Sequence, residues 1–495
     1  MALSAYLEHI LKDAEELPPA RPYINHAVAF KQPVTPRERA EALEKAGLNV
    51  FFYPAALING CDLLSDSGTG AMTNEQWASL HYGDEAYGSN QGYFLLREQV
   101  RHTFGDLFFN NLTGSFNAFL FHQDRAAECA LFTQIGKLGT GLIIPSNGHF
   151  DTTHANIEAN GMRALNLFSP ALKRKEDSSA FKGDMDTERF IQLLEESRAK
   201  VPLVYLTITN NTGGGQPVSL GNIAEVARIA HAQGIPLFLD ACRFAENAWF
   251  IQQREPGYRE KAIPDIVREI FSYADGFTIS FKKDGLANMG GGLFLKENGL
   301  FVRKYPRMSD ALTNHQILTE GNPTYGGLSG RDIMTIVEGL KTVVRQEYLD
   351  YRTSQVQAFG EHMKELGLPV LTPAGGHAVY MDMTEFFSDT RMRHEDFGGI
   401  SCTALLLAAY GHRACELGDF AFGSYDTVAG KDNFPEVNFV RFAVPRLRYE
   451  REDLEAVAGA VKALYDRRDE MPPVRVTYGR DLPLRHFKAR FEFID

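Results

Sequence analysis

Two short stretches of sequence decide the fold: Ile235-Pro-Leu-Phe-Leu-Asp240-Ala-Cys-Arg243 and Gly276-Phe-Thr-Ile-Ser280-Phe-Lys-Lys283-Asp284. In each, an apolar run long enough for one strand is followed directly by charged residues. Further apolar runs lie at 141–145, 202–207 and 291–295, and helical patterns such as 222–233 separate them. Apolar strands that alternate with helices predict an α/β fold with a mostly parallel sheet covered on both faces.

The charged residues that follow these strands form a candidate site, because ligands bind at the carboxyl ends of strands in such sheets. Pyridoxal phosphate needs a lysine amine for a Schiff base and a carboxylate that keeps its pyridine nitrogen protonated, which are the roles open to Lys283 and Asp240. Each residue also has a structural explanation. The two lysines fit a solvated turn, Asp240 fits a helix N-cap, and Arg243 fits its surface partner.

A candidate phosphate site lies upstream, where His122-Gln123-Asp124-Arg125 opens a helical pattern. A helix N-terminus with nearby donors binds phosphate, and Ser280 adds a hydroxyl. Phe150, after the strand at 141–145, is a candidate for stacking on a planar cofactor, although a core position explains it equally well.

Composition narrows the function further. The chain has 495 residues, 44% hydrophobic and 23% charged, and a net charge of -12. This balance excludes extended disorder and disfavours nucleic acid or an anionic membrane as the main partner. The five cysteines contain no C-x-x-C pair, and the acidic first twenty residues do not resemble a secretion signal. The longest apolar stretches, such as 404–410, are too short to cross a membrane, so we expect a soluble, cytoplasmic protein.

The pattern predicts three parts. Residues 1–60 form an N-terminal arm that packs with the small domain, 61–330 form a large cofactor-binding domain, and 331–495 form a smaller α+β domain. The boundary is placed at the glycine-rich segment 325–330, which precedes a long helical pattern.

Six separated motifs, taken together, resemble the tryptophanase and tyrosine phenol-lyase family of β-eliminating lyases. They are Ser65-Asp-Ser67-Gly-Thr-Gly, Gly83-Asp-Glu85-Ala-Tyr87, Gly213-Gly-Gly-Gln-Pro-Val, Asp240-Ala-Cys-Arg243, Lys282-Lys283-Asp284 and Pro323-Thr-Tyr325-Gly-Gly-Leu. The resemblance runs from about residue 37 to the C-terminus. It implies the fold-type-I transferase fold, pyridoxal 5'-phosphate as cofactor, and a homotetramer with active sites between subunits.

The resemblance also assigns roles at the cofactor. Lys283 resembles the Schiff-base lysine and Asp240 the pyridinium partner, while Phe150 matches the stacking ring. Asn211 and Arg243 match groups near the cofactor's phenolic oxygen. The phosphate shell is matched by Gln123, Asp124, Arg125, Ser280 and Lys282.

Roles at the substrate follow in the same way. Arg441 resembles the arginine that binds the substrate α-carboxylate, and its planar fork suits that task. Ser65 and Ser67 match positions near the carboxylate, and Tyr87 resembles the general acid that helps to expel the leaving group. Gly68, Glu85 and Asn288 match a site for a monovalent cation, potassium or ammonium.

Three positions bear on the leaving group. Tyrosine phenol-lyases carry a threonine after the stacking phenylalanine and an arginine in the small domain, where this sequence has Asp151 and Leu417. Without that arginine a phenol oxygen would lose its charged partner. Tryptophanases carry an aspartate, an aliphatic residue and a histidine near the C-terminus, matched here by Asp151, Leu417 and His486. A structural role for His486 remains the alternative, and the resemblance favours L-tryptophan as the substrate.

Two departures keep other readings open. Asp124 replaces the usual glycine of the phosphate loop, and Phe281 replaces a small residue. An Asn-rich segment at 110–117 is also unusual. The alternatives are elimination from tyrosine or another aromatic amino acid such as DOPA, reductive deamination, and a non-catalytic protein that binds pyridoxal phosphate.

Overall fold

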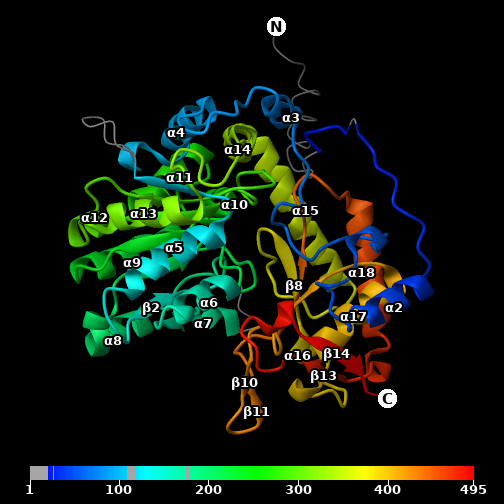
Figure 1. Ribbon diagram of the computed structural model, residues 1–495. Coiled ribbons are helices and arrows are strands. Elements are labelled where there is room, and N and C mark those ends of the chain that lie inside the picture. Colours follow the sequence, from blue (N-terminus) through cyan, green and yellow to red (C-terminus); the bar gives the residue numbers. More distant parts are fainter. Residues whose placement is uncertain (1–20, 26, 109–116, 174–178, 495) are drawn as a thin grey trace, which may run out of the picture.

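The structure is a computed structural model that describes residues 21–25, 27–108, 117–173 and 179–494 (Figure 1). The helix expected within the first twenty residues and nearly all of the Asn-rich segment therefore lie outside the described residues.

A five-stranded sheet forms the centre of the larger part of the molecule. Its order is β1 (Ala118–Phe121), β7 (Gly291–Leu295), β6 (Gly276–Ser280), β5 (Leu237–Asp240) and β4 (Val204–Thr207). Strands β4, β5 and β6 are parallel, and β7 runs antiparallel to both of its neighbours. A parallel pair, β2 (Ile143–Ser146) and β3 (Arg163–Asn166), continues beside β4. The mostly parallel sheet is confirmed.

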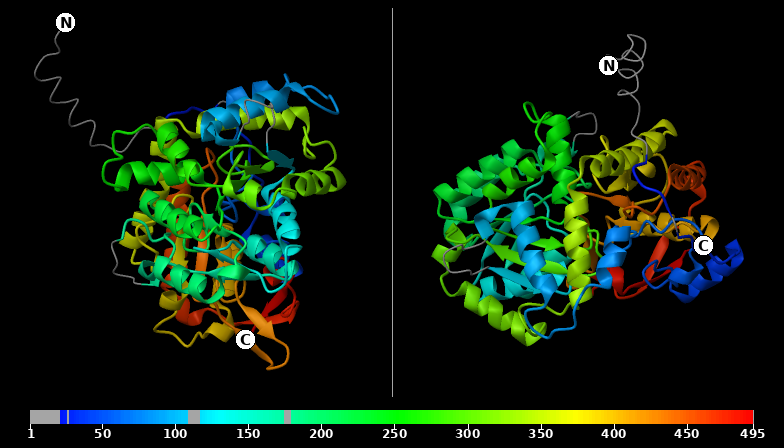
Figure 2. Two further views of the ribbon diagram at one scale, coloured as in Figure 1. Left: turned by 90° about the vertical axis from the view of Figure 1, so that its left-hand side faces the viewer. Right: turned by 90° about the horizontal axis from the view of Figure 1, so that it is seen from above.

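Helices cover both faces of this sheet, as Figure 2 shows. The covering helices include α4 (Gln91–Phe104), α5 (Asp124–Gly136), α6 (Asp151–Ala159), α8 (Thr187–Ser197), α9 (Leu220–Ala232), α10 (Phe244–Arg254), α11 (Ile263–Ser272) and α13 (Met308–Thr319). In α11 the buried residues Ile263, Ile266, Val267, Ile270 and Phe271 recur at helical spacing and form one buried face. The strands are buried on both sides, which explains why they read as continuous apolar runs.

A second, smaller core surrounds an antiparallel three-stranded sheet in the order β8 (Ala378–Asp382), β12 (Phe439–Ala443) and β9 (Cys415–Leu417). Helices α15 (Gln346–Glu365), α17 (Gly398–Tyr410) and α18 (Arg451–Tyr465) lie around it (Figure 1). Arm helix α2 (Pro36–Lys45) packs on α17, and the hairpin of β13 (Val474–Tyr478) and β14 (Arg490–Phe493) completes the same side. In the described residues, α2 therefore lies against the elements that surround the small sheet.

The change from one core to the other falls within α15 rather than at residue 330. Helix α14 (Gly330–Val343) packs on α4, and its buried side chains Ile333 and Leu340 belong to the core of the large sheet. In α15, Leu349 still belongs to that core, whereas Val356 and Phe359 belong to the core of the small sheet. One continuous helix therefore connects the two cores.

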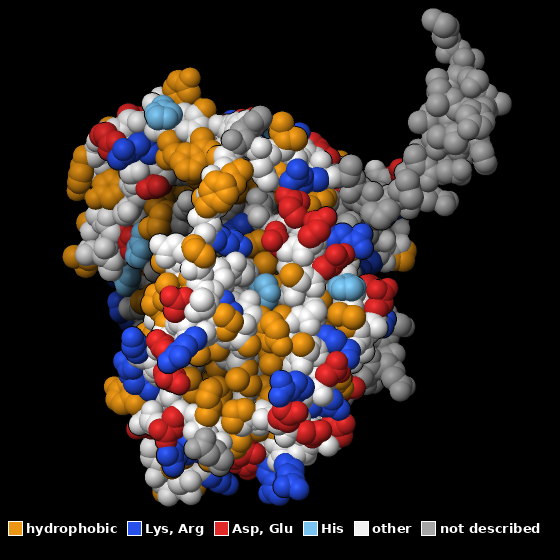
Figure 3. All heavy atoms as spheres, turned by 90° about the vertical axis from the view of Figure 1, so that its right-hand side faces the viewer, with side chains coloured by type: hydrophobic (Ala, Val, Ile, Leu, Met, Phe, Trp, Pro, Cys, Tyr) orange, Lys and Arg blue, Asp and Glu red, His pale blue; other side chains and the backbone are white. Residues whose placement is uncertain are grey.

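The surface and the helices agree with the composition. On the face seen in Figure 3, acidic and basic side chains are interspersed, with apolar side chains between them. None of the helices in the described residues is long and apolar enough to span a bilayer.

Candidate active site

One cavity gathers most of the predicted site residues. Eleven of them line it: Ser67, Gln123, Asp124, Arg125, Phe150, Asn211, Asp240, Arg243, Ser280, Lys282 and Lys283. They come from the carboxyl ends of β5 and β6, from the segments after β4, β5 and β6, from the starts of α5 and α6, and from the loop that holds Ser67, which are distant in sequence. The topology of the sheet brings them together as expected.

One end of the cavity is suited to a phosphate. Helix α5 begins there, and the side chain of its N-cap residue Gln123 makes no capping bond to the helix. Arg125, Ser280 and Lys282 line the same cavity. The approach of β7 to this helix start is so close that a Cβ on Gly291 would lie 2.2 Å from the Asp124 nitrogen, so glycine is required there. The helix amides and cations together make an anion site.

Lys283 and Asp240 follow neighbouring parallel strands, since Asp240 pairs with Thr278 on β6. Burial lowers the pKa of Lys283, but Cys242, Asp124 and Asp240 outweigh it and leave that pKa above its ordinary value. The residue after the lysine fixes the turn, because Asp284 Oδ2 accepts the Ala245 amide at 2.8 Å at the start of α10. Lys283 is therefore held on a rigid turn at the cavity wall.

Six buried charges, which we call the six-charge cluster, lie behind this turn. They are Arg243, Arg352 and Arg446 with Asp66, Glu246 and Asp284. Arg446 bonds to all three carboxylates, at 2.9 Å to Asp66 and 2.8 Å to the other two. Burial opposes the ionisation of Asp66, but Arg243 and Arg446 hold its pKa well below the usual range. The cluster is electrically balanced, and it links the small-sheet side, through Arg446, to the Lys283 turn.

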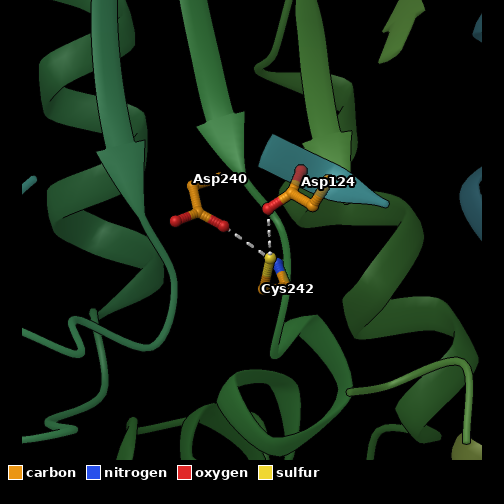
Figure 4. Close-up of side chains that lie close together, drawn as sticks. All are labelled: Asp124, Asp240 and Cys242. Carbon is orange, nitrogen blue, oxygen red and sulfur yellow. Dashed lines mark hydrogen bonds between the residues drawn. The ribbon is translucent and has the colours of Figure 1, made fainter. Parts of the chain in front are cut away.

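A second group, the acid cluster, comprises Asp124, Glu128, Asp240 and Cys242. The three carboxylates line the cavity, and Figure 4 shows Asp124 and Asp240 with Cys242 beside them. Cys242 Sγ donates to Asp124 Oδ2 at 3.0 Å, and the Cys242 amide donates to Asp240 Oδ1 at 3.2 Å. Glu128 accepts hydrogen bonds from Thr153 and Tyr205. Burial and the nearby Asp124 and Asp240 raise the pKa of Glu128 well above its ordinary value. Unlike the six-charge cluster, this group contains acids and a thiol but no cation of its own.

Asn211 connects the cavity to the small sheet. Its Oδ1 accepts hydrogen bonds from His377 Nε2 at 3.1 Å, from the Tyr380 hydroxyl and from Arg441 Nη1 at 3.3 Å. Burial and Arg243 lower the pKa of His377 well below its usual value, so its ring is neutral. With Oδ1 occupied by three donors, the amide nitrogen of Asn211 is left to donate toward the cavity. Arg441 reaches the site through this contact.

The residues predicted for the leaving group also meet. His486 Nε2 lies 2.9 Å from Asp151 Oδ2, and both side chains are buried. Burial opposes the ionisation of Asp151, but the hydrogen bond and charge of His486 lower its pKa. Leu417 belongs to an apolar cluster on the small sheet that includes Phe51, whose ring lies 5.8 Å from that of His486. Asp151 adjoins Phe150, which lines the cavity.

Five other predicted residues are not among those that line the cavity. The carbonyl of Asn288 lies beside Gly68, 3.0 Å from where a Cβ would stand. Glu85 is exposed and forms an ion pair with Arg331, and Tyr87 is 73% exposed with its ring against Tyr325. Within the described chain, Tyr87 and Glu85 do not line the cavity. Ser65 lies at its edge, where its hydroxyl accepts the Ser67 amide at 3.1 Å.

Sequence reasoning missed several functional positions. The six-charge cluster was overlooked except for Arg243, although Asp284 directly follows the predicted lysine and Asp66 lies between two predicted serines. Tyr380 and His377 were also missed. A polar residue inside an apolar strand, as Tyr380 is in Ala378–Asp382, was the available signal.

The cavity fits pyridoxal phosphate at each of its functional groups. Lys283 can react with the aldehyde, Asp240 can pair with the ring nitrogen, and Phe150 can stack on the ring. The start of α5 with Gln123, Arg125, Ser280 and Lys282 can hold the phosphate. A lysine and a carboxylate at the ends of adjacent parallel strands, beside an anion site, define a pyridoxal-phosphate enzyme of fold type I.

Comparisons with known proteins make the assignment specific. Residues 62–460 match the family model described as Beta-eliminating lyase. A tryptophanase from Rhodobacter capsulatus is 41% identical over 92% of this chain and 95% of its own length. A tyrosine phenol-lyase from Fusobacterium nucleatum is 36% identical over 96% of this chain and 98% of its own. The chain belongs to the β-eliminating lyase family.

The fold comparison agrees. An aspartate aminotransferase from Thermotoga maritima superposes with a TM-score of 0.56 at 13% identity, over 88% of this chain and 98% of that one. The fold-type-I prediction is confirmed, and the protein is a pyridoxal-phosphate-dependent β-eliminating lyase.

Proposed function

We propose that the protein eliminates indole from L-tryptophan and forms pyruvate and ammonia. The observation that carries this proposal is the buried Asp151–His486 pair next to an apolar cluster that contains Leu417. An indole offers an N–H donor and requires a proton at carbon 3, which a carboxylate and an imidazole can serve. A phenol would need a charged partner for its oxygen, and Leu417 supplies none.

The other side chains have roles that follow from their contacts. Arg441 is the group for the substrate carboxylate, because its Nε has no partner and its position is fixed by bonds to Asn211 and the Leu64 carbonyl. Ser65 and Ser67 flank that position. Lys283 is the base for the α-proton, since it lines the cavity on a rigid turn. Bound pyridoxal phosphate supplies the electron sink that stabilises the negative charge at the α-carbon.

Tyr87 and Glu85 enter the proposal through assembly. Both are exposed in one chain, so their roles as general acid and cation ligand require a second copy that places them at the Gly68 and Asn288 side of the site. Exposed Trp77 and Tyr82 on the same segment support such a contact. We therefore propose a homotetramer that binds a monovalent cation, and light scattering with and without potassium tests both. All five cysteines are free, which supports a cytoplasmic location.

The decisive experiment is a steady-state assay of pyruvate formation from L-tryptophan, L-tyrosine and L-DOPA with the purified enzyme. We expect kcat/KM for L-tryptophan to exceed the other two by at least tenfold. Higher activity on tyrosine or DOPA would contradict the tryptophan proposal while leaving β-elimination intact. Mass spectrometry of the products identifies reductive deamination, and the absence of turnover with a retained cofactor would indicate a non-catalytic protein.

Two matched variants sharpen the assay. His486→Phe keeps a ring of similar size but removes the bond to Asp151, so activity on L-tryptophan should fall strongly. Leu417→Arg restores the charged partner that a phenol needs and should raise the ratio of tyrosine to tryptophan turnover. An unchanged ratio would show that the residue at position 417 does not determine which leaving group the enzyme accepts.

A further inference from the structure

The acid cluster contains a carboxylic acid that the proposed reaction does not use. Asp124 is the first residue of α5, and its side chain turns toward Cys242 and Asp240 (Figure 4). One carboxylate oxygen of Asp124, one of Asp240 and the Cys242 Sγ all lie within 4.8 Å of one another. The side chain of Asp124 therefore lies beside the carboxylate assigned to the ring nitrogen.

Among the described residues, none of the acids Asp124, Glu128 and Asp240 forms an ion pair, although four cations line the same cavity. From α5 it faces Glu128 and Arg125, from the segment after β5 it faces Asp240 and Cys242, and from β6 and its turn it faces Thr278, Lys282 and Lys283. Lys283 is the neighbouring cation that favours an ionised Asp124, and Arg243 is bound to Asp66. Two carboxylates this close in a buried site do not both ionise readily, and the pair holds a proton.

The hydrogen bonds indicate which acid carries that proton. Asp240 Oδ1 accepts a backbone amide at 3.2 Å, whereas Asp124 receives the weak S–H donor of Cys242 on Oδ2. Asp124 Oδ1 is buried and has no partner. Ionised carboxylates are stabilised by several donors, so the poorly solvated acid is the one that stays neutral. Burial and Asp240 raise the pKa of Asp124 to about 6, against Lys283 and the hydrogen bonds of Cys242 and Thr278.

We propose that Asp124 is a positioning residue that holds a proton beside Asp240 when the cofactor is bound, so that the pair presents one negative charge, not two, to the ring nitrogen of the cofactor. One carboxylate charge matches one protonated ring nitrogen. An ionised Asp124 would instead place a second charge on the first residue of the helix whose amides hold the phosphate. Ionisation of Asp124 should therefore weaken cofactor binding.

The first test needs no cofactor. Infrared difference spectra of the cofactor-free protein are recorded at pH 6 and pH 8 for the wild type and Asp124→Asn. We expect a carboxylic-acid carbonyl band at pH 6 that is absent from the variant and weaker at pH 8. An ordinary aspartate is about 99% ionised at pH 6, so the absence of such a band would overturn the proposal.

Two control variants assign the band. Asp469→Asn changes an exposed carboxylate and should leave the difference unaffected. Glu128→Gln should remove a separate band, because Glu128 is a distinct buried acid of the cluster. If Glu128→Gln instead removes the band attributed to Asp124, the proton belongs to Glu128 and the proposal is wrong.

The second test measures binding of pyridoxal phosphate by its absorbance between pH 6.5 and 8.5. Titration of the phosphate itself is common to all variants, so the comparison isolates Asp124. We expect wild-type affinity to fall with pH more steeply than that of Asp124→Asn, by up to about tenfold per pH unit. Asp124→Gly introduces the residue that is usual in the family. Its affinity should depend on pH as that of Asp124→Asn does, and it replaces Asp124→Asn in the comparison if that variant does not fold. Equal slopes would overturn the proposal, and neither test depends on lyase turnover.

Discussion

Two buried charged groups lie on opposite sides of the same lysine, and they differ in balance. The six-charge cluster behind the Lys283 turn has three arginines and three carboxylates joined by direct ion pairs. The acid cluster at the cavity has three carboxylates and a thiol, with Lys283 as its neighbouring cation. In the balanced group each carboxylate is paired with an arginine, which fixes structure, although burial and Glu246 still raise the pKa of Asp284 to about 6. An unbalanced group must exchange protons, so its charge follows pH and ligand.

The largest expected effect comes from removing the cation that the acid cluster depends on. Lys283→Ala should lower kcat by roughly a thousandfold or more, because it deletes the group that bonds to the cofactor and takes the proton. The measurement is pyruvate formation together with the visible absorbance of the covalently bound cofactor. Lys282→Ala is the matched control, and it should weaken phosphate affinity but keep the covalent absorbance. Substantial turnover by Lys283→Ala would remove this lysine from the mechanism.

Breaking the balanced cluster should mainly cost stability. Arg446→Met leaves Asp66, Glu246 and Asp284 without their shared partner, and unpairing a buried charge costs about 3 to 5 kcal/mol. Urea unfolding measures the free energy, with Arg451→Met as an exposed arginine control on α18. A loss below about 1 kcal/mol would show that the cluster is not a structural centre.

Neutralising an acid of the unbalanced cluster should raise the free energy of unfolding, whereas breaking the balanced cluster lowers it. The pKa of Asp124 is raised in the folded protein to about 6 from an ordinary value near 3.9. The stability that this group contributes is therefore fully present below pH 4 and is lost as pH rises through 6. Asp124→Asn should therefore be more stable than the wild type at pH 8, by about 2 kcal/mol, and the difference should vanish near pH 4. Thermal unfolding of the cofactor-free protein across this range checks the sign, which a destabilised variant at pH 8 would contradict.

The smallest effect on activity is expected from a substitution outside both clusters. Tyr380→Phe removes one of three donors to Asn211 Oδ1, a loss of about 1 kcal/mol or a five-fold change. The change should fall on kcat/KM and on the absorbance maximum of the bound cofactor, since Asn211 is oriented by this bond. An unshifted spectrum would show that His377 and Arg441 suffice to orient Asn211.

Much of the fold and of the cavity could be predicted from local sequence patterns. The strands before Asp240 and Lys283 form where the apolar runs end, and eleven predicted residues line one cavity. The charged clusters were not predictable in the same way. Arg446 and Asp66 are 380 residues apart, and Arg446 and Asp284 are 162 apart, so no local spacing relates them.

The second feature that the sequence could not predict is the direction in which a side chain points. The sequence motif places Asp124 at the start of the phosphate-binding helix but does not show where its side chain points. In the structure the side chain lies toward Asp240 and Cys242. Similarly, Tyr87 and Glu85 were predicted as site residues, but their exposed positions in one chain follow from packing and not from their own motif.

The bond between His486 and Asp151 joins positions 335 residues apart. During synthesis on the ribosome, residues of the large sheet emerge well before residue 486, so the cofactor end of the site can be built first. The indole end must wait for the chain that carries His486. A nascent chain halted just before His486 would already contain every residue that lines the cavity, so the cofactor end of the site and its indole end are completed at different times.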